Sequence, residues 1–306
     1  MLTSIRGRRG MAVAPHALAA QSALDVLREG GNAVEAMIAA AATIAVVYPH
    51  MNSIGGDSFW LIHHPGQAPS AIDGCGAAGA HASIDWYRAR GLRDAIPFRG
   101  GVAANTVAGT VAGWGAAHLL SRRSLGGRMP LSRLLEDAIY YAKAGVPMTL
   151  SQIASTARLA GELKDQPGYA QTFLQRGRVP KTGALFVQKR LAATLEHIAK
   201  AGIDDFYRGE LASEIAKDLK RIGSPLTAAD LHAHHAAFVD PLRLRHSAGT
   251  LYNTAPPTQG LVSLLILGIL DELKVGRTGP ASPEFVHLCV EAAKQAFTVR
   301  DRYLED

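Results

Sequence analysis

The sequence predicts a layered domain in which helices pack on a β-sheet, and its first eighty residues carry the main evidence. Residues 33–47 are alanine-rich and apolar on nearly every side, which is typical of a helix buried on several faces. A glycine-bearing loop and two short apolar runs follow at once, at residues 58–64 and 70–73, with a Pro-Gly turn between them. A buried helix followed by such a hairpin predicts helices laid on a sheet.

Capping and stop residues mark the ends of the expected helices. Residues 16–29 form the first, which Gly30 ends, and Asn32 caps the second with Glu35 three residues on. Pro49 stops the second helix. Apolar residues at helical spacing predict further helices at 83–90, 113–121, 131–144, 150–163, 188–201, 210–221, from Thr227 onward, 261–273 and 285–303. Short strands are expected at 242–246 and 250–254, and a small-residue strand and loop at 100–105.

Glycines gather at two places. Gly55 and Gly56 precede a strand, which indicates backbone that passes close to another segment. A second group lies within residues 100–113 and would suit close packing or a phosphate loop. The Gly-x-x-x-x-Gly-Lys-Ser/Thr pattern is absent, and no Gly-x-Gly-x-x-Gly follows a clear strand, so nucleotide binding is not favoured.

Composition narrows the function classes. The chain has 306 residues, of which 48% are hydrophobic and 19% charged, as in soluble globular proteins. Its net charge of +6 comes from basic residues spread along the chain, so nucleic-acid binding is not expected. The two cysteines, Cys75 and Cys289, do not cluster, and we expect no disulfide framework, no metal and no cofactor. No signal-peptide-like segment precedes Pro15, and the apolar tract 36–47 is too short for a membrane span, so a cytoplasmic location is expected.

Few residues stand out as a catalytic set. Cys75 lies between glycines and could be a nucleophile or simply a tolerated cysteine. Its candidate partners are His63, His64 and His81. Asp57 and Asp73 could form a carboxylate pair, although each also suits turns and loop capping. These residues alone are compatible with two function classes. One is an enzyme whose active residues lie partly elsewhere, and the other is a helical scaffold that binds a partner.

A group of histidines follows Thr227. His232, His234 and His235 are spaced so that a helix would not bring them to one face as His-x-x-x-His ligands require. We therefore expect a solvated helix face there.

Seven motifs together give the chain a family resemblance. They are GMAVAPH at 10–16, GGNAVEA at 30–36, PH at 49–50 with IGG at 54–56 and FWLI at 59–62, GTVAG at 109–113, DFYRG at 205–209, LTAADL at 226–231 and APPTQG at 255–260. In this order and spacing they resemble the large subunit of the γ-glutamyltranspeptidase family, from about residue 10 to residue 303.

The resemblance implies an N-terminal-nucleophile hydrolase with an α+β fold, a four-layer αββα sandwich. Such a proenzyme cuts itself, and the new N-terminal threonine of the small subunit attacks an amide carbonyl with its own α-amino group as base. On this basis residues 1–10 are a leader and residues 11–306 the large subunit, with a helical lobe at about 114–240. The implied partner is the small subunit, with a dimer of such pairs allowed, and no catalytic residue is expected in this chain.

Two positions depart from the family pattern. Cys75 occupies the position of an arginine that grips the α-carboxylate of a glutamyl group, and its loss should cost a few kcal/mol of binding. The usual Val-Pro-Gly-Thr is here Val-Ala-Gly-Thr at 107–110. The resemblance thus makes Asp73, Gly74 and Cys75 substrate-binding candidates. Arg99 is a further candidate anion partner, with an ordinary surface arginine as the alternative.

The lost arginine favours a small amide as substrate. We expect an amidohydrolase of the oxamate amidohydrolase or acylase-like branches of the family, with nucleic acid and membrane excluded as partners. A γ-glutamyltransferase or glutathione hydrolase is the first alternative, and an unprocessed, non-enzymatic scaffold is the second.

Overall fold

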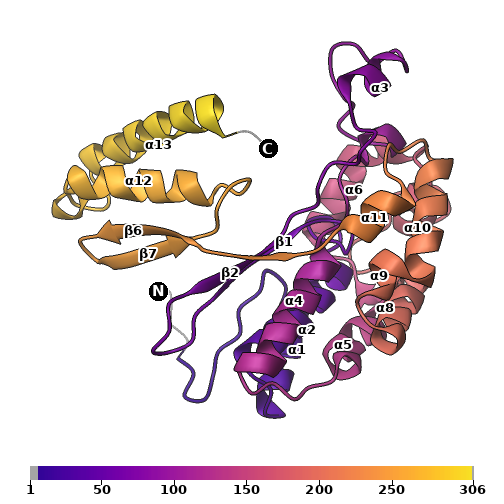
Figure 1. The fold of residues 1–306 in the computed structure, drawn as a ribbon, viewed down its shortest axis with the longest axis horizontal. Coiled ribbons are helices and arrows are strands. Elements are labelled where there is room, and N and C mark those ends of the chain that lie inside the picture. The colour runs from indigo at the N-terminus through magenta and orange to yellow at the C-terminus, as the bar shows by residue number, and fades with distance from the viewer. Residues whose placement is uncertain (1–5, 305–306) are drawn as a thin grey trace. The chain divides into compact units, whose positions relative to one another are not determined.

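The computed structural model describes residues 6–304, so the expected leader and the last two residues lie partly or wholly outside the described chain. The chain forms two compact units (Figure 1). We call residues 6–58 and 74–236 the helical unit, and residues 59–73 and 237–304 the sheet unit.

The core of the helical unit is built around one helix. The expected helix at 33–47 is α2, Ala33–Val47, and it packs against α1 (Ala17–Arg28), α4 (Thr110–Ser124) and α5 (Leu131–Ala144). Its side chains are buried on several sides, with Ile38 fully enclosed. The predicted burial is therefore confirmed, because three neighbouring helices cover an apolar surface that extends nearly all round.

The N-terminus of α2 has the predicted capping box. Asn32 Oδ1 accepts hydrogen bonds from the N–H groups of Val34 and Glu35, both at 3.0 Å, and Glu35 Oε2 accepts from Asn32 N–H at 2.9 Å. The other oxygen, Glu35 Oε1, accepts from Met129 N–H at 2.8 Å. Glu35 is only 1% exposed. Its burial is tolerated because each carboxylate oxygen accepts a backbone hydrogen bond.

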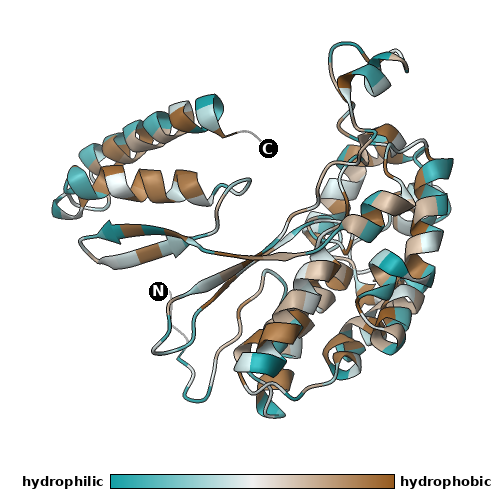
Figure 2. Ribbon diagram, viewed as in Figure 1, coloured by the Kyte–Doolittle hydropathy of each residue, from teal (hydrophilic) through white to brown (hydrophobic). Residues whose placement is uncertain are grey.

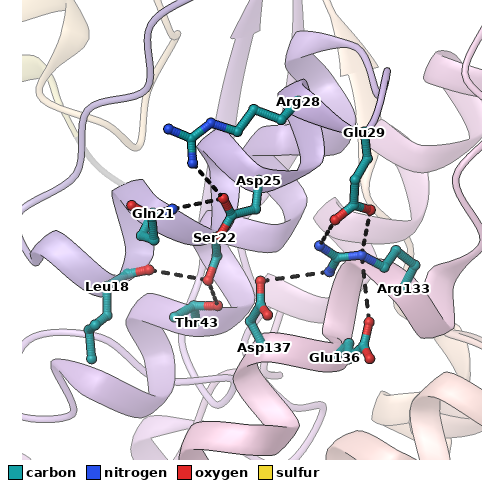
Figure 3. A network of polar contacts seen from close by, with 10 residues as sticks. All are labelled: Leu18, Gln21, Ser22, Asp25, Arg28, Glu29, Thr43, Arg133, Glu136 and Asp137. Carbon is teal, nitrogen blue, oxygen red and sulfur yellow. Dashed lines mark hydrogen bonds and ion pairs between the residues drawn. The ribbon is translucent and has the colours of Figure 1, made fainter.

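Arg133 joins α5 to the end of α1 (Figure 3). Its Nε and Nη2 donate to the two oxygens of Glu29 at 2.7 and 2.5 Å, and Asp137 and Glu136 lie at 3.6 and 3.5 Å. The hydrogen bond from Arg133 lowers the pKa of Glu29, and the Glu29 carboxylate raises the pKa of the Arg133 guanidinium. This two-point ion pair fixes the two helices relative to each other.

The remaining elements of the helical unit include the other predicted helices, together with two short strands and two short helices that were not predicted. They are α3 (Ile84–Arg88), η1 (Gly101–Ala103), β3 (Val146–Pro147), α6 (Leu150–Leu163), α7 (Tyr169–Phe173), β4 (Leu185–Phe186), α8 (Lys189–Ala201), α9 (Asp205–Arg208), α10 (Glu210–Arg221) and α11 (Ala228–Ala233). The strand expected at 100–105 is wrong, because this segment is the 3-10 turn η1. A Cβ on Gly101 would lie 1.7 Å from the carbonyl oxygen of Ile222, so the backbone here packs against the end of α10.

The sheet unit contains the predicted hairpin. β1 (Ser58–Ile62) and β2 (Ser70–Gly74) are neighbours, and β2 also pairs antiparallel with β5 (Ala237–Val239). The sequence reasoning missed β5, since three residues directly after a helix carry no periodic signal.

A ribbon and two helices complete the sheet unit. β6 (Leu242–His246) and β7 (Gly249–Asn253) pair antiparallel, and α12 (Gly260–Glu272) packs on both strands and on α13 (Pro283–Tyr303). A short turn, η2 (Val275–Arg277), joins the two helices. Figure 2 shows that α12 is apolar over most of its length. Among the described residues, no helix combines the length and hydropathy needed to cross a membrane.

Candidate functional site

The loop between α2 and β1 is fastened to the start of α4. Thr110 N–H donates to Gly56 O at 2.8 Å, and Thr110 Oγ1 donates to Asp57 O at 2.9 Å. Gly56 therefore makes the close backbone approach predicted for this glycine pair, but the space does not require glycine: a Cβ on Gly55 would meet its nearest atom at 3.4 Å, and one on Gly56 at 3.9 Å. The pair tolerates side chains sterically because the nearest atoms, from Ser53 and Thr110, lie at ordinary contact distances.

A closer approach, which does require glycine, occurs between residues 74–76 and 107–109. A Cβ on Gly109 would lie 2.0 Å from Gly74 O, and one on Gly76 would lie 1.5 Å from Val107 O. Val107 N–H also donates to Ala77 O at 2.9 Å. Only glycine lets these two segments touch, which explains the small residues on both sides of Cys75.

Asp57 lies beside Cys75. Asp57 Oδ1 accepts from Gly76 N–H at 2.9 Å, and Oδ2 lies 3.8 Å from Cys75 Sγ. At the position where the family resemblance places an arginine, this chain therefore has a thiol next to a carboxylate. The Asp57 carboxylate beside this position repels an anionic group of a ligand.

The other predicted site residues lie on different elements. Asp73 is on β2 in the sheet unit, opposite Ala237, whereas Gly74 and Cys75 begin the next segment of the helical unit. Arg99 Nη1 contacts both carboxylate oxygens of Glu162, at 2.8 and 2.9 Å. A substrate anion would have to compete with Glu162 for Arg99. The role of Arg99 as an anion partner stays a prediction.

Two further motifs support the segments around Cys75. Tyr207 OH donates to Ala108 O at 2.6 Å and accepts from Ala112 N–H at 2.9 Å, and burial raises the pKa of its phenol. The motif at 205–209 thus contacts the motif at 109–113. Tyr207 joins the loop before α4 to the first turn of that helix.

Asp230 fixes the chain a few residues after Cys75. Its Oδ1 accepts from Ala80 N–H at 2.8 Å, and its Oδ2 accepts from Thr227 N–H and Oγ1, both at 2.7 Å. Burial opposes ionisation of Asp230, but these hydrogen bonds outweigh it and lower its pKa. Gly79 N–H donates to Asn105 O at 2.9 Å, so residues 75–80 are held from two sides.

The histidine group matches the prediction of a solvated helix face only in part: His232 and His235 are exposed, but His234 is buried. α11 ends at Ala233, and His234 is 7% exposed, with its ring 5.3 Å from that of Tyr207. Arg208 Nη2 donates to the His234 carbonyl at 2.7 Å. His234 is therefore part of the packing under α9. Across residues 6–304, no three His, Cys, Asp or Glu side chains gather as a metal-binding group.

A cavity of about 540 Å³ adjoins the Asp57 loop within the helical unit; we call it the α2–α4 cavity. It is lined by Ala41, Ile44, Ala45, Pro49, His50, Met51, Asn52, Ser53, Gly56, Asp57, Ser58, Thr110 and Trp114. The sequence reasoning placed Trp114 only in a helical run and His50 only in a motif. No local signal marks either as a cavity residue, because the cavity forms where residues 41–58 meet Thr110 and Trp114 on α4.

Comparisons with known proteins agree with this geometry. The Gamma-glutamyltranspeptidase family model matches residues 19–306. An oxamate amidohydrolase proenzyme of Klebsiella pneumoniae is 54% identical over 97% of this chain and 55% of its own length. A glutathione hydrolase-like proenzyme of Bacillus subtilis is 38% identical over 100% of this chain and 57% of its own length. The chain thus spans little more than half the length of these relatives.

A solved structure gives the same result for the fold. The γ-glutamyltranspeptidase of Helicobacter pylori aligns with a TM-score of 0.90 and 28% identity over 99% of this chain and 86% of that one. The predicted fold class, the α+β fold of the N-terminal-nucleophile hydrolases, is confirmed. The chain belongs to the γ-glutamyltranspeptidase family.

Proposed function

We propose that this chain is the large subunit of an autoprocessed amidohydrolase that hydrolyses a small amide of the oxamate type. The 54% identical relative is an oxamate amidohydrolase proenzyme, and the chain spans 55% of that protein. Both facts support a precursor that supplies a second, small chain.

In the proposed reaction the small chain provides the nucleophile. The hydroxyl of its N-terminal threonine attacks the amide carbonyl, its α-amino group takes the proton, and ammonia leaves from the resulting tetrahedral intermediate. Water then hydrolyses the acyl-threonine ester and releases the carboxylic acid. The large subunit contributes the wall against which the acyl part of the substrate lies.

The Asp57–Cys75 contact carries the substrate assignment. A γ-glutamyl substrate presents an α-carboxylate, which an arginine would bind through two charge-assisted hydrogen bonds. Here the Asp57 carboxylate lies 3.8 Å from the thiol of Cys75, and like charges disfavour an anion at this point. A small amide without a distant α-carboxylate avoids this repulsion.

The second candidate is a glutathione hydrolase, because the 38% identical relative is glutathione hydrolase-like. It requires another cation near the substrate. Arg99 is engaged with Glu162, so this route needs Glu162 to release it.

Mass spectrometry and an ammonia assay on the whole precursor test the proposal. We expect two chains, the second beginning with threonine, and release of ammonia from oxamate. A single unprocessed polypeptide would support the scaffold alternative and contradict the proposal. A processed enzyme that releases no ammonia from oxamate or other short amides would also contradict it.

A further inference from the structure

A second cavity of the helical unit is lined by α3, α10 and the segment that follows α10; we call it the α3–α10 cavity. Its volume of about 630 Å³ lies within the range of small-molecule sites. Its charged side chains are Arg90, Lys217 and Lys220, with His81 beside them, and no Asp or Glu lines it. All of its lining belongs to the helical unit. The wall of this cavity is therefore positively charged.

One face of α10 lines the α3–α10 cavity. Ser213, Ala216, Lys217 and Lys220 all take part, at the i, i+3, i+4 and i+7 spacing that places residues on a single helix face. The two lysines are three residues apart, where like charges repel and destabilise a helix slightly. An anion bound between the two ammonium groups would remove this repulsion.

Lys220 differs from its cationic neighbours on α10 because it has no acidic partner. Lys217 Nζ lies 2.7 Å from Glu214 Oε1, and Arg221 Nη2 lies 2.9 Å from Asp218 Oδ1. Three and four residues before Lys220, where an acid would pair with it, the helix has a lysine and an alanine. Across residues 6–304, no carboxylate oxygen lies within 4.0 Å of its ammonium group.

Arg90 is a second cation without an acidic partner, and Trp86 holds it in place. Arg90 Cζ lies 3.6 Å from the centre of the Trp86 ring, and its Nη1 donates to Trp86 O at 3.1 Å. Within the described part of the chain, Arg90 forms no ion pair. The Nε–Nη2 edge of its guanidinium is therefore available to bind two oxygens of one anion.

Two acids lie close to the α3–α10 cavity without lining it. Glu214 is paired with Lys217, and Asp230 accepts hydrogen bonds from Ala80 N–H and from the N–H and hydroxyl of Thr227. The positive charge of His81 also favours the ionised form of Asp230 and lowers its pKa. Both carboxylates are thus engaged with other groups and leave Arg90 and Lys220 unneutralised.

The two unpaired cations select the ligand chemistry. A phosphate group has more than one negative charge near neutral pH and three terminal oxygens, so it can contact Arg90 and Lys220 at once. A single carboxylate has charge enough for only one of them. Pro225 and Leu226 add an apolar side that suits a short organic group. Because the cations gather around one cavity of limited volume, the chemistry fits a small molecule.

We propose that the α3–α10 cavity binds the phosphate group of a small molecule, with the Arg90 guanidinium and the Lys220 ammonium as its charged contacts. The ligand class is a phosphate monoester with a short organic part, and inorganic phosphate would use the same contacts. Trp86 is a positioning residue, since it orients Arg90. The site does not require the proposed amidohydrolase activity, and its test measures binding alone.

Isothermal titration calorimetry on the whole protein, with every chain of the precursor present, tests the proposal in a phosphate-free buffer of low ionic strength. Ribose 5-phosphate, inorganic phosphate and ribose are titrated in turn. We expect both phosphate compounds to bind at one site and ribose not to bind. Tighter binding of ribose 5-phosphate would identify an organic phosphate as the ligand, and equal binding would identify free phosphate.

Variants of the two cations locate the site. Arg90→Ala and Lys220→Ala should each weaken binding about tenfold or more, because each removes a charge-assisted contact. The matched control is Arg221→Ala, which removes the same charge from the next position of α10, outside the cavity, and should change the affinity less than about twofold. Equal weakening in all three variants would mean that net charge alone attracts the anion, and would overturn the proposal. Failure of both phosphate compounds to bind the wild-type protein would also overturn it.

Hydrogen exchange of the wild-type protein gives a readout that needs no variant. Saturating ribose 5-phosphate, or inorganic phosphate if it binds more tightly, should slow exchange of the amides at residues 86–91 and 223–228. Amides of α5 should exchange at the same rate with and without ligand. Binding that leaves exchange at 223–228 unchanged would place the anion elsewhere and contradict the assignment.

Discussion

Two apolar helices, α2 and α12, differ in how the chain covers them. α2 buries eleven of its fifteen residues between α1, α4 and α5. α12 is similarly apolar, yet only Gly260, Val262 and Leu264 of its thirteen residues are buried within the described chain. The same kind of sequence therefore gives a closed core in one unit and an uncovered surface in the other.

α13 also leaves large apolar side chains exposed. Leu267 of α12 is 39% exposed, and Val286, Val290 and Phe297 of α13 are 56%, 51% and 42% exposed. A group of large apolar side chains left in water is typical of a surface that another chain covers. In the proposed function, the small subunit is the chain that would cover it.

The largest effect is expected from truncating the α2 core. Ile38 is fully buried, so Ile38→Ala should lower the free energy of unfolding by about 3 kcal/mol through lost burial and a residual cavity. Leu267→Ala, the matched change on α12, should cost less than about 1 kcal/mol in the isolated chain. Urea denaturation of both variants measures the difference.

Equal costs for the two variants would contradict the difference in burial between α2 and α12. A sharper result comes from repeating Leu267→Ala in the presence of the small chain. If that chain covers α12, the variant weakens association more than it destabilises the isolated large chain.

The next effect concerns the buried carboxylate that begins α2. Glu35→Ala removes the acceptor for the N–H groups of Asn32 and Met129 and should cost about 2 kcal/mol. Glu136→Ala, on the exposed side of α5, is the control and should change stability by less than about 0.5 kcal/mol. Thermal unfolding of both proteins tests this, and a neutral Glu35→Ala would show that the capping box is dispensable.

Tyr207→Phe should have a smaller effect. It leaves Ala108 O and Ala112 N–H without their shared partner, for a loss of about 1 to 2 kcal/mol. Because this hydroxyl ties the 107–110 loop to α4, hydrogen exchange of Ala112 N–H should accelerate more than that of α5 amides. Uniform acceleration would contradict a local role.

The smallest effect is a dependence on pH. Burial lowers the pKa values of His16 and His50, so near and below the ordinary histidine value of 6.5 the unfolded chain binds more protons than the folded one. Stability should therefore be fully present above pH 6.5 and fall as the solution is acidified below pH 6.5, which a series from pH 7.5 to 5.5 measures. His50→Gln should weaken this dependence, and a wild-type stability that rises on acidification would contradict it.

Prediction from sequence succeeded where the signal was local. α5, α6 and α10 begin and end at the predicted residues, because periodic apolar positions and flanking Gly or Pro define them. It failed where tertiary contact decides. Gly101 packs against Ile222 and forms a turn in place of a strand, and β5 exists only because β2 lies beside it.

In the candidate site, too, some residues carry a local sequence signal and others are brought in only by tertiary contacts. The family motif located Cys75, but nothing near it in the sequence placed Asp57 against its thiol. Trp114 and His50 each look ordinary alone, and only the packing of α4 beside α2 brings them to one cavity.

We propose that a thiol beside a carboxylate, in place of an arginine, directs the processed protein away from γ-glutamyl substrates. The most direct measurement is the ratio of kcat/KM for oxamate to that for γ-glutamyl-4-nitroanilide, in wild type and in Asp57→Asn/Cys75→Arg. We predict a wild-type ratio above about 100, since a two-point charged contact contributes a few kcal/mol, and a clear fall in the double variant. A wild-type ratio near or below one would contradict the account.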